Sequence, residues 1–188
     1  MPVPSFEIVG LLILVFELAL SVSRRSDHAR DADHDRRSVR WLWIWILIGV
    51  GGAHAVTWSG VGPQYRIGTA SSLAALSILA CGFALRAWAI RALGKWFTVD
   101  VVIRPGHQLV THGPFRLIRH PSYAGLALMF LGWGLLFGNW LALPSLLVPF
   151  VLAFLYRVRL EEQTLEAAFP SAYPAYRSRT KRLVPFVY

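Results

Sequence analysis

The chain contains 188 residues, of which 55% are hydrophobic and only 15% are charged. Soluble domains are about 45–50% apolar and about 25% charged, so this composition excludes a disordered chain and argues against a soluble globule. The single cysteine, Cys81, excludes an internal disulfide and a cysteine-based zinc site. A net charge of +9 suggests nucleic-acid binding in a soluble protein, but here the charge follows the connections between apolar runs, and we expect no nucleic-acid partner.

Long apolar runs predict an all-α integral membrane protein with five transmembrane helices. The runs cover residues 6–22, 41–58, 67–90, 123–137 and 140–156. The first run has no basic segment before it and no small-residue cleavage site after it, which favours a retained span over a signal peptide. The fourth run is short for a hydrocarbon core of about 30 Å, and the turn dipeptide Gly138-Asn139 predicts a hairpin with the fifth.

The basic residues predict the orientation of these helices. Six Lys and Arg fall in residues 24–40, five in 91–121 and six from 157 to the end, whereas the other connections contain only Arg66. Cytoplasmic connections carry the excess of Lys and Arg, so the N-terminus is expected outside and the C-terminus in the cytoplasm. The basic segments are also expected to interact with anionic membrane lipids.

The chain divides into two parts on this topology. Residues 1–60 hold two N-terminal helices and a charged loop, 24–40, whose mixed Arg, Asp and His residues predict a mobile cytoplasmic segment without a metal site. Residues 61–188 form a core of three helices, a cap at 91–121 and a C-terminal cytoplasmic segment at 157–188 with a helix of its own. The cap combines Gly and Pro with apolar residues, which predicts an ordered cover over the helix ends.

Two clusters and one isolated residue are candidates for ligand binding or catalysis. Pro121 fits the first turn of the fourth helix and places His120 at its start, where free backbone N–H groups either bind a polar ligand or merely belong to a basic membrane anchor. Arg157 and Glu161 are four residues apart, so they share a helix face and form either a site for a zwitterionic ligand or an exposed ion pair. Arg86, inside the third span, either faces a cavity or extends to the headgroups.

Six short stretches in order resemble the isoprenylcysteine carboxyl methyltransferase family, within the wider group of integral-membrane methyltransferases that includes phospholipid methyltransferases. They are residues 106–111 (GHQLVT), 113–115 (GPF), 119–125 (RHPSYAG), 157–165 (RVRLEEQTL), 173–176 (YPAY) and 182–185 (RLVP). The resemblance covers about 100 residues, from Leu85 to the end, and residues 1–60 contain nothing that matches it.

The resemblance implies methyl transfer from S-adenosylmethionine to a lipophilic, isoprenylcysteine-like carboxylate at the cytoplasmic membrane face. Arg86 and Arg157 would be the catalytic residues that hold the substrate carboxylate. The implied cofactor residues are His107, Gln108, Leu109, Val110, Phe115, His120, Pro121, Ser122, Tyr123 and Glu161.

Three other functions are compatible with these residues. A phospholipid amine could replace the carboxylate as methyl acceptor, although two arginines favour an anion. Membrane sterol reductases have a similar Arg-His-x-x-Tyr-x-Gly stretch and use NADPH. A small lipid-binding scaffold would explain the basic loops but not the cap or the Glu161-Glu162 pair. The compact length is typical of a bacterial or archaeal inner-membrane protein.

Overall fold

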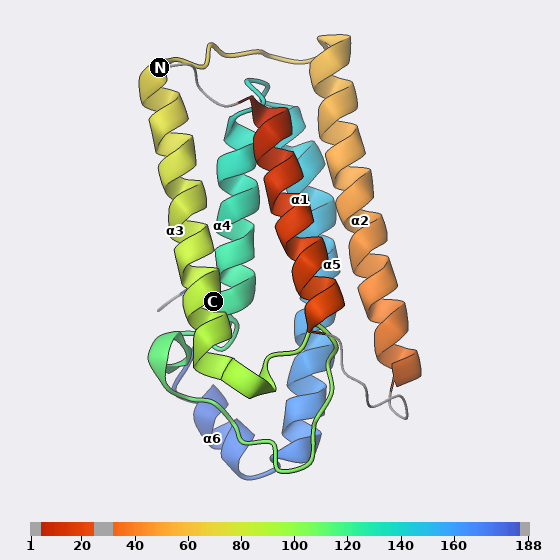
Figure 1. Cartoon of the computed structure of the whole chain (residues 1–188), viewed down its shortest axis with the longest axis vertical. Coiled ribbons are helices and arrows are strands. Elements are labelled where there is room, and N and C mark those ends of the chain that lie inside the picture. Colours follow the sequence, from red (N-terminus) through yellow and green to blue (C-terminus); the bar gives the residue numbers. More distant parts are fainter. Residues whose placement is uncertain (1–4, 25–31, 185–188) are drawn as a thin grey trace.

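The structure is a computed structural model that describes residues 5–24 and 32–184, the side chains of residues 32–37 excepted. Helices α1 to α5 lie side by side along the long axis, and the connections around η1, η2 and α6 gather at one end (Figure 1). The described ranges contain no strand, which confirms the all-α class. The elements are α1 (Phe6–Ser23), α2 (Ala32–Ser59), α3 (Thr69–Leu93), η1 (Gly94–Trp96), η2 (Gly113–Arg116), α4 (Pro121–Leu135), α5 (Ala142–Ala168) and α6 (Ala172–Arg177).

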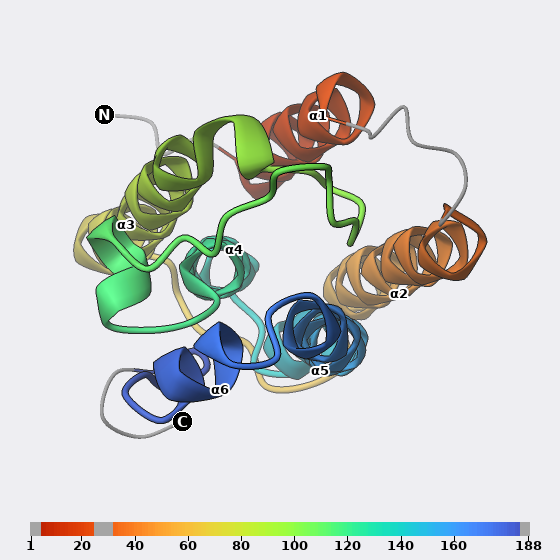
Figure 2. The ribbon, with the colours of Figure 1, turned by 90° about the horizontal axis from the view of Figure 1, so that it is seen from below.

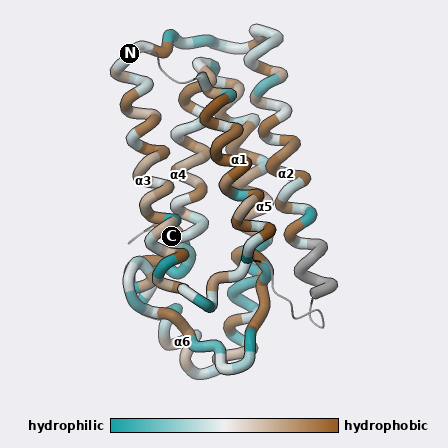
Figure 3. The backbone as a smooth tube through the Cα atoms, in the orientation of Figure 1, coloured by the Kyte–Doolittle hydropathy of each residue, from teal (hydrophilic) through white to brown (hydrophobic). Residues whose placement is uncertain are grey.

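The bundle has the character of an integral membrane protein. Four helical stretches are long and apolar enough to cross a membrane: Phe6–Ser23, Ser38–Ser59, Thr69–Trp96 and Ala142–Ala168. Hydrophobic residues are frequent along these helices, whereas hydrophilic residues are frequent in the cap (Figure 3). Helix α4, with 15 residues, is shorter than a typical span of about 20 residues. The count of five spans and the orientation of the termini therefore stay predictions.

The short helix α4 lies at the centre of the bundle, with α1, α2, α3 and α5 arranged around it when the molecule is viewed from the cap end (Figure 2). Its side chains Met129, Phe130 and Trp133 are almost fully buried, and Phe130 stacks on Phe150 of α5 with ring centroids 4.4 Å apart. A helix that is apolar on all sides lies in a protein core or a membrane, and here the neighbouring helices bury the large side chains of α4. This explains how a short helix can hold the core together.

Glycines allow α3 and α4 to pack backbone against backbone. A Cβ atom added to Gly82 would lie 2.5 Å from the carbonyl oxygen of Gly125, and one added to Gly125 would lie 2.7 Å from the backbone nitrogen of Arg86. Gly132 faces Ala75 of α3 in the same way, at 2.6 Å. Small residues at this spacing permit close helix approach in membranes. Because α3 and α4 touch here, the small residues of α4 serve packing, and a lipid cannot enter between these two helices.

We expect Gly82→Leu to lower the thermal unfolding midpoint of the detergent-solubilised protein markedly, because the new side chain has to push α4 away. Overpacking of this kind costs about 1–3 kcal/mol, and here the obstructing atoms are backbone. Gly51→Leu is the matched control, since a Cβ atom at Gly51 meets nothing within 4 Å. Equal midpoints for the two variants would contradict this account of the interface.

Helix α1 is fastened to the bundle at two heights. Near its start, the indole of Trp133 packs against Gly10 and donates a hydrogen bond of 2.8 Å to the carbonyl oxygen of Phe6. Near its end, the backbone N–H of Val99 in the cap donates to the carbonyl oxygen of Arg24 at 3.2 Å. The cap-proximal half of α1 therefore borders both the bundle and the cap.

The connection between α1 and α2 differs from the predicted loop 24–40. Residues 25–31, with Asp27 and His28, lie outside the described residues, but α2 begins at Ala32, so residues 32–40 extend the second helix. The charged composition alone did not separate a loop from a polar first part of a helix.

Candidate functional site

A large cavity opens where the bundle meets the cap. Its walls come from the cap-proximal parts of α1 to α5, and residues 96–103, 107, 109 and 110 of the cap close it from below. The space between the atoms measures about 1340 Å³, including the part that is open to solvent. The described elements that supply its walls lie far apart in sequence, so the cavity exists only in the folded bundle.

The predicted site residues come together in this cavity, with one exception. The side chain of Gln108 is exposed and does not line the cavity in the described structure. The residues that do line it are Arg86, His107, Leu109, Val110, Phe115, His120, Pro121, Ser122, Tyr123, Arg157 and Glu161.

Arg86 points into the bundle and is 6% exposed, so it does not extend to the headgroups. Its Nη1 donates to the hydroxyl of Ser122 at 2.8 Å and to the Ser122 carbonyl at 3.2 Å. Its Nη2 donates to Glu17 Oε2 of α1 at 2.5 Å. A charged residue inside a span needs such a partner, and Glu17 provides it.

Arg157 lies across the cavity in α5 and is 3% exposed. Its Nη1 donates to the Ser38 hydroxyl of α2 at 3.0 Å, and its Nη2 donates to the carbonyl oxygen of Val99 in the cap at 2.5 Å. The planar guanidinium has five donors in a fixed fork, which suits it to hold several acceptors at once. Arg157 thus ties α2, α5 and the cap together at the cavity wall.

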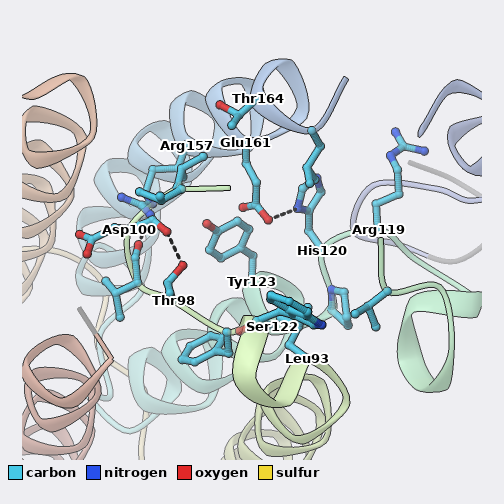
Figure 4. Close-up of a pocket in the computed structure, with 18 of the residues that line it drawn as sticks. Leu93, Thr98, Asp100, Arg119, His120, Ser122, Tyr123, Arg157, Glu161 and Thr164 are labelled. Atoms are coloured by element: carbon cyan, nitrogen blue, oxygen red, sulfur yellow. Dashed lines mark hydrogen bonds and ion pairs between the residues drawn. The ribbon is translucent and has the colours of Figure 1, made fainter. Parts of the chain in front are cut away.

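Glu161, His120 and Tyr123 form the side of the cavity next to α6. Glu161 Oε1 is 3.8 Å from His120 Nδ1, and the imidazole stacks on the Tyr123 ring with centroids 5.7 Å apart. Figure 4 shows the Tyr123 ring below Glu161, with its hydroxyl pointing toward the side where Arg157 and Asp100 lie. About a third of the Glu161 side chain is exposed, so its carboxylate remains accessible.

An aromatic stack forms the cap side of the cavity. Trp96 and His107 lie face to face with ring centroids 4.8 Å apart, Lys95 Nζ is 4.5 Å from the Trp96 ring centre, and Phe169 meets His107 edge-on. Burial lowers the pKa of His107, and the nearby Arg104 lowers it further. The imidazole is therefore neutral near pH 7, and it stacks on Trp96 in this form.

We expect the stability contribution of His107 to decrease on acidification. Because its pKa is lower in the folded chain than the ordinary value of about 6.5, the unfolded chain takes up the proton first, and the contribution is lost as the pH falls below about 6.5. The thermal midpoint of the wild type should therefore drop more between pH 7.5 and 5.5 than that of His107→Asn. Parallel pH profiles of the thermal midpoint in the two proteins would contradict a His107 side chain that is buried and neutral in the folded chain.

The two adjacent glutamates of α5 have different surroundings. Glu162 is buried away from the cavity, where Arg119 Nε at 3.0 Å, Arg182 Nη2 at 2.7 Å and His120 Nε2 at 3.4 Å surround its carboxylate. The C-terminal residues pair with the start of α4 beside it: the N–H of Arg119 donates to the Lys181 carbonyl at 2.7 Å. Glu162 therefore holds the C-terminal segment in place, and Glu161 alone faces the cavity.

Sequence reasoning missed Glu17 and Trp96. Helix α1 meets the cap at Arg24, seven residues after Glu17, and α3 meets it at Gly94, eight residues after Arg86. The two charges therefore lie at a similar depth in the bundle. Opposite charges at matching depth in two predicted spans are a signal for a buried pair. Trp96 gave no such signal, because a tryptophan near a span end fits a membrane interface equally well.

The fold and the site together define a helical membrane protein with a polar, arginine-lined cavity under a cap. The sequence profile of the isoprenylcysteine carboxyl methyltransferase (ICMT) family matches residues 74–167. This stretch contains α3 from residue 74 onward, the cap, α4 and nearly all of α5. The chain belongs to this family, which confirms the resemblance.

Two curated relatives agree with this assignment. The chain is 33% identical over 114 residues to protein-S-isoprenylcysteine O-methyltransferase B of Arabidopsis thaliana, covering 60% of this chain and 58% of the relative. It is 34% identical over 117 residues to protein-S-isoprenylcysteine O-methyltransferase of Schizosaccharomyces pombe, covering 60% of this chain and 49% of the relative.

The structural comparison extends over more of the chain. The eukaryotic intramembrane Ras methyltransferase ICMT superposes with a TM-score of 0.58 and 24% identity, covering 86% of this chain and 55% of that one. At this identity the likeness shows the fold. The chain spans about half the length of the curated relatives it matches.

Proposed function

We propose that the protein transfers a methyl group from S-adenosylmethionine to the carboxylate of a lipophilic, isoprenylcysteine-like acceptor. The observation that carries the proposal is the cavity at the junction of an apolar bundle and a polar cap, whose walls hold two buried arginines and an accessible glutamate. The arginines suit an anionic acceptor, the glutamate suits a cationic donor, and the bundle suits a lipid tail.

The residues present fit S-adenosylmethionine. Glu161 supplies a carboxylate for its cationic end. The stack of Trp96 and His107 offers an aromatic platform, and His107 Nδ1 is buried without a hydrogen-bond partner among the described residues. When bound there, S-adenosylmethionine would supply the electrophilic methyl group.

The chain's own residues would position the acceptor and exclude water. A carboxylate is already ionised near pH 7, because ordinary carboxyl pKa values are about 4, so ester formation needs no general base. Alignment of a nucleophile with an electrophile can remove several kcal/mol from a barrier. Arg86 and Arg157 would orient the carboxylate, and the cap residues 96–103 would cover it.

We further propose that the cap faces the cytoplasm and that the protein resides in a bacterial or archaeal inner membrane. The charge distribution supports this orientation, because the basic connections lie at the cap end of the bundle. The site would then be reached by acceptors and cofactor made in the cytoplasm.

The direct test uses purified protein, methyl-labelled S-adenosylmethionine and two acceptors. N-acetyl-S-farnesylcysteine should acquire label, whereas dioleoylphosphatidylethanolamine should not. Label on the phospholipid alone would replace the carboxylate by an amine as the acceptor. Binding of NADPH in place of S-adenosylmethionine would favour a reductase instead.

We expect Glu161→Gln to weaken S-adenosylmethionine binding by about 10–100-fold in isothermal titration calorimetry. The substitution keeps the shape of the side chain and removes the charge, and a hydrogen bond to a charged group contributes about 1.5–3 kcal/mol. Glu166→Gln is the matched control on the same helix, because Glu166 is half-exposed and paired with Arg177 at 3.3 Å. Equal affinities of the two variants would remove Glu161 from the cofactor site.

A further inference from the structure

The ion pair between α1 and α3 occupies an arginine to which the proposed function assigns the acceptor carboxylate. Glu17 Oε2 accepts a hydrogen bond from Arg86 Nη2 at 2.5 Å, and Arg86 Nη1 donates to the hydroxyl and the carbonyl of Ser122. The Arg86 guanidinium is buried, so in this state the chain itself uses both Nη atoms. An acceptor carboxylate can bind Arg86 only when one of these partners leaves.

Glu17 is the partner that an acceptor can replace. Its carboxylate has the charge and the shape of the acceptor carboxylate, whereas the Ser122 groups are neutral and belong to the start of α4. Exchange of one carboxylate for another keeps Arg86 paired, and this matters because a buried charge that loses its partner is strongly destabilising. Glu17 and Arg86 both line the cavity, whose open part can hydrate the released Glu17 carboxylate.

The two halves of α1 are held to the protein in different ways. Val9 and Ile13, the buried hydrophobic residues of α1, lie in its first half and belong to the core of the bundle. The buried residues of its second half are Glu17 and Ser21, which are polar and line the cavity. Apolar packing therefore anchors the first half, and polar contacts hold the second half, which can move when an acceptor replaces Glu17.

We propose that Glu17 is autoinhibitory: its carboxylate takes the place of the acceptor carboxylate on Arg86 until an acceptor displaces it. This inference rests on the proposed function and adds a closed state of the site. The closed state lowers the apparent affinity for the acceptor, because only the fraction of molecules with a free arginine binds it. A lipid without an anionic group offers Arg86 no replacement for Glu17 and leaves the pair closed.

The same contact acts again after the reaction. Methyl transfer converts the acceptor carboxylate into a neutral ester, and hydrogen bonds between two charged groups are stronger than those to a neutral partner. Glu17 then regains Arg86 and displaces the ester, so the closed state favours release of the product. Glu17 does not touch the reacting atoms in this scheme, and it determines how often Arg86 is free.

The test measures binding without chemistry, by isothermal titration calorimetry with S-adenosylhomocysteine in place of the methyl donor. We expect Glu17→Gln to bind N-acetyl-S-farnesylcysteine about 10-fold more tightly than the wild type, because a neutral amide competes less well for Arg86 than a carboxylate does. The methyl ester of this acceptor should also bind more tightly to the variant. The ester is neutral, so the mere loss of a negative charge from the cavity would not produce that second result.

Glu17→Asp separates the contact from the charge and supplies a second variant should Glu17→Gln fail to fold. The aspartate keeps the negative charge, but its shorter side chain reaches Arg86 less well. Its affinity for the acceptor should therefore lie between those of the wild type and Glu17→Gln, whereas a general charge effect would leave it at the wild-type value. Glu7→Gln, at an exposed position on the same helix, should keep the wild-type affinity.

Acceptor binding by Glu17→Gln and Glu17→Asp that is equal to or weaker than that of the wild type would overturn the inference, and Glu17 would then only orient Arg86. The proposed function would stand in that case, provided that the wild type forms the methyl ester. A wild type that neither binds the acceptor nor forms its ester would overturn the proposed function, and the inference with it.

Discussion

Arg157→Met is expected to lower kcat/KM for a carboxylate acceptor by about 10²-fold, the size of effect that a misplacement of the reacting groups by about 1 Å can cause. Arg157 is 3% exposed and joins Ser38 of α2 to the carbonyl of Val99 in the cap, so its loss removes a positive charge and loosens one cavity wall. Affinity for S-adenosylmethionine should change little, because Glu161 and the aromatic stack are untouched.

Two further variants separate charge from geometry at this position. Arg157→Lys retains the charge but cannot present two parallel donors, so it should recover only part of the activity. Arg159→Met is the matched control, because Arg159 is exposed two residues further along α5. If Arg157→Met turned over as fast as Arg159→Met, the carboxylate would have to be held elsewhere.

Glu162→Ala is expected to destabilise the cap end by about 3–5 kcal/mol, as found when one partner of a buried ion cluster is removed. The substitution leaves Arg119 and His120 without their shared carboxylate, and both are buried or nearly so. We expect a lower thermal midpoint and faster hydrogen exchange at the N–H groups of Arg119 and His120. These groups donate to the Lys181 and Arg182 carbonyls in the folded chain.

The corresponding control is Glu166→Ala. Glu166 forms its ion pair with Arg177 at the surface, where both side chains are 49% exposed, and such pairs contribute little to stability. Similar losses of stability in the two alanine variants would show that Glu162 does not anchor the C-terminal segment.

The arrangement of the helices could be predicted well from the sequence because apolar runs, turn dipeptides and helix-start signals are local. The predicted start of the fourth helix at Pro121 and the continuation of the fifth beyond Arg157 agree with α4 and α5. The start of α2 was harder to predict from the sequence, because a polar stretch can be either a loop or the first turns of a helix.

The contacts within the cavity depend on helix rotation, which sequence spacing does not determine. Neighbouring residues on an α-helix point about 100° apart, so only one of Glu161 and Glu162 can face the cavity. The motif that contains both could not say which one does. Likewise, the pairing of Glu17 with Arg86 joins residues 69 positions apart and depends on how α1 packs on the core.

The resemblance predicted the residues of the cavity but not how the helices bring them together. The close packing of α3 on α4 explains this for Arg86. Gly82 and Gly125 bring α3 against α4, which places the Arg86 guanidinium beside Ser122 at the start of α4. A larger residue at either glycine would move the arginine out of reach. The glycines therefore position the site although they do not contact a ligand.

The measurement that tests the central claim most directly is alkaline release of label after a single turnover with methyl-labelled S-adenosylmethionine and N-acetyl-S-farnesylcysteine. A methyl ester hydrolyses in base to volatile methanol, whereas a methylated amine keeps its label. We predict that the label is released as methanol and that its formation depends on Arg157. Label that resists alkali, or an ester formed equally well by Arg157→Met, would contradict a cavity built to align a carboxylate with a methyl donor.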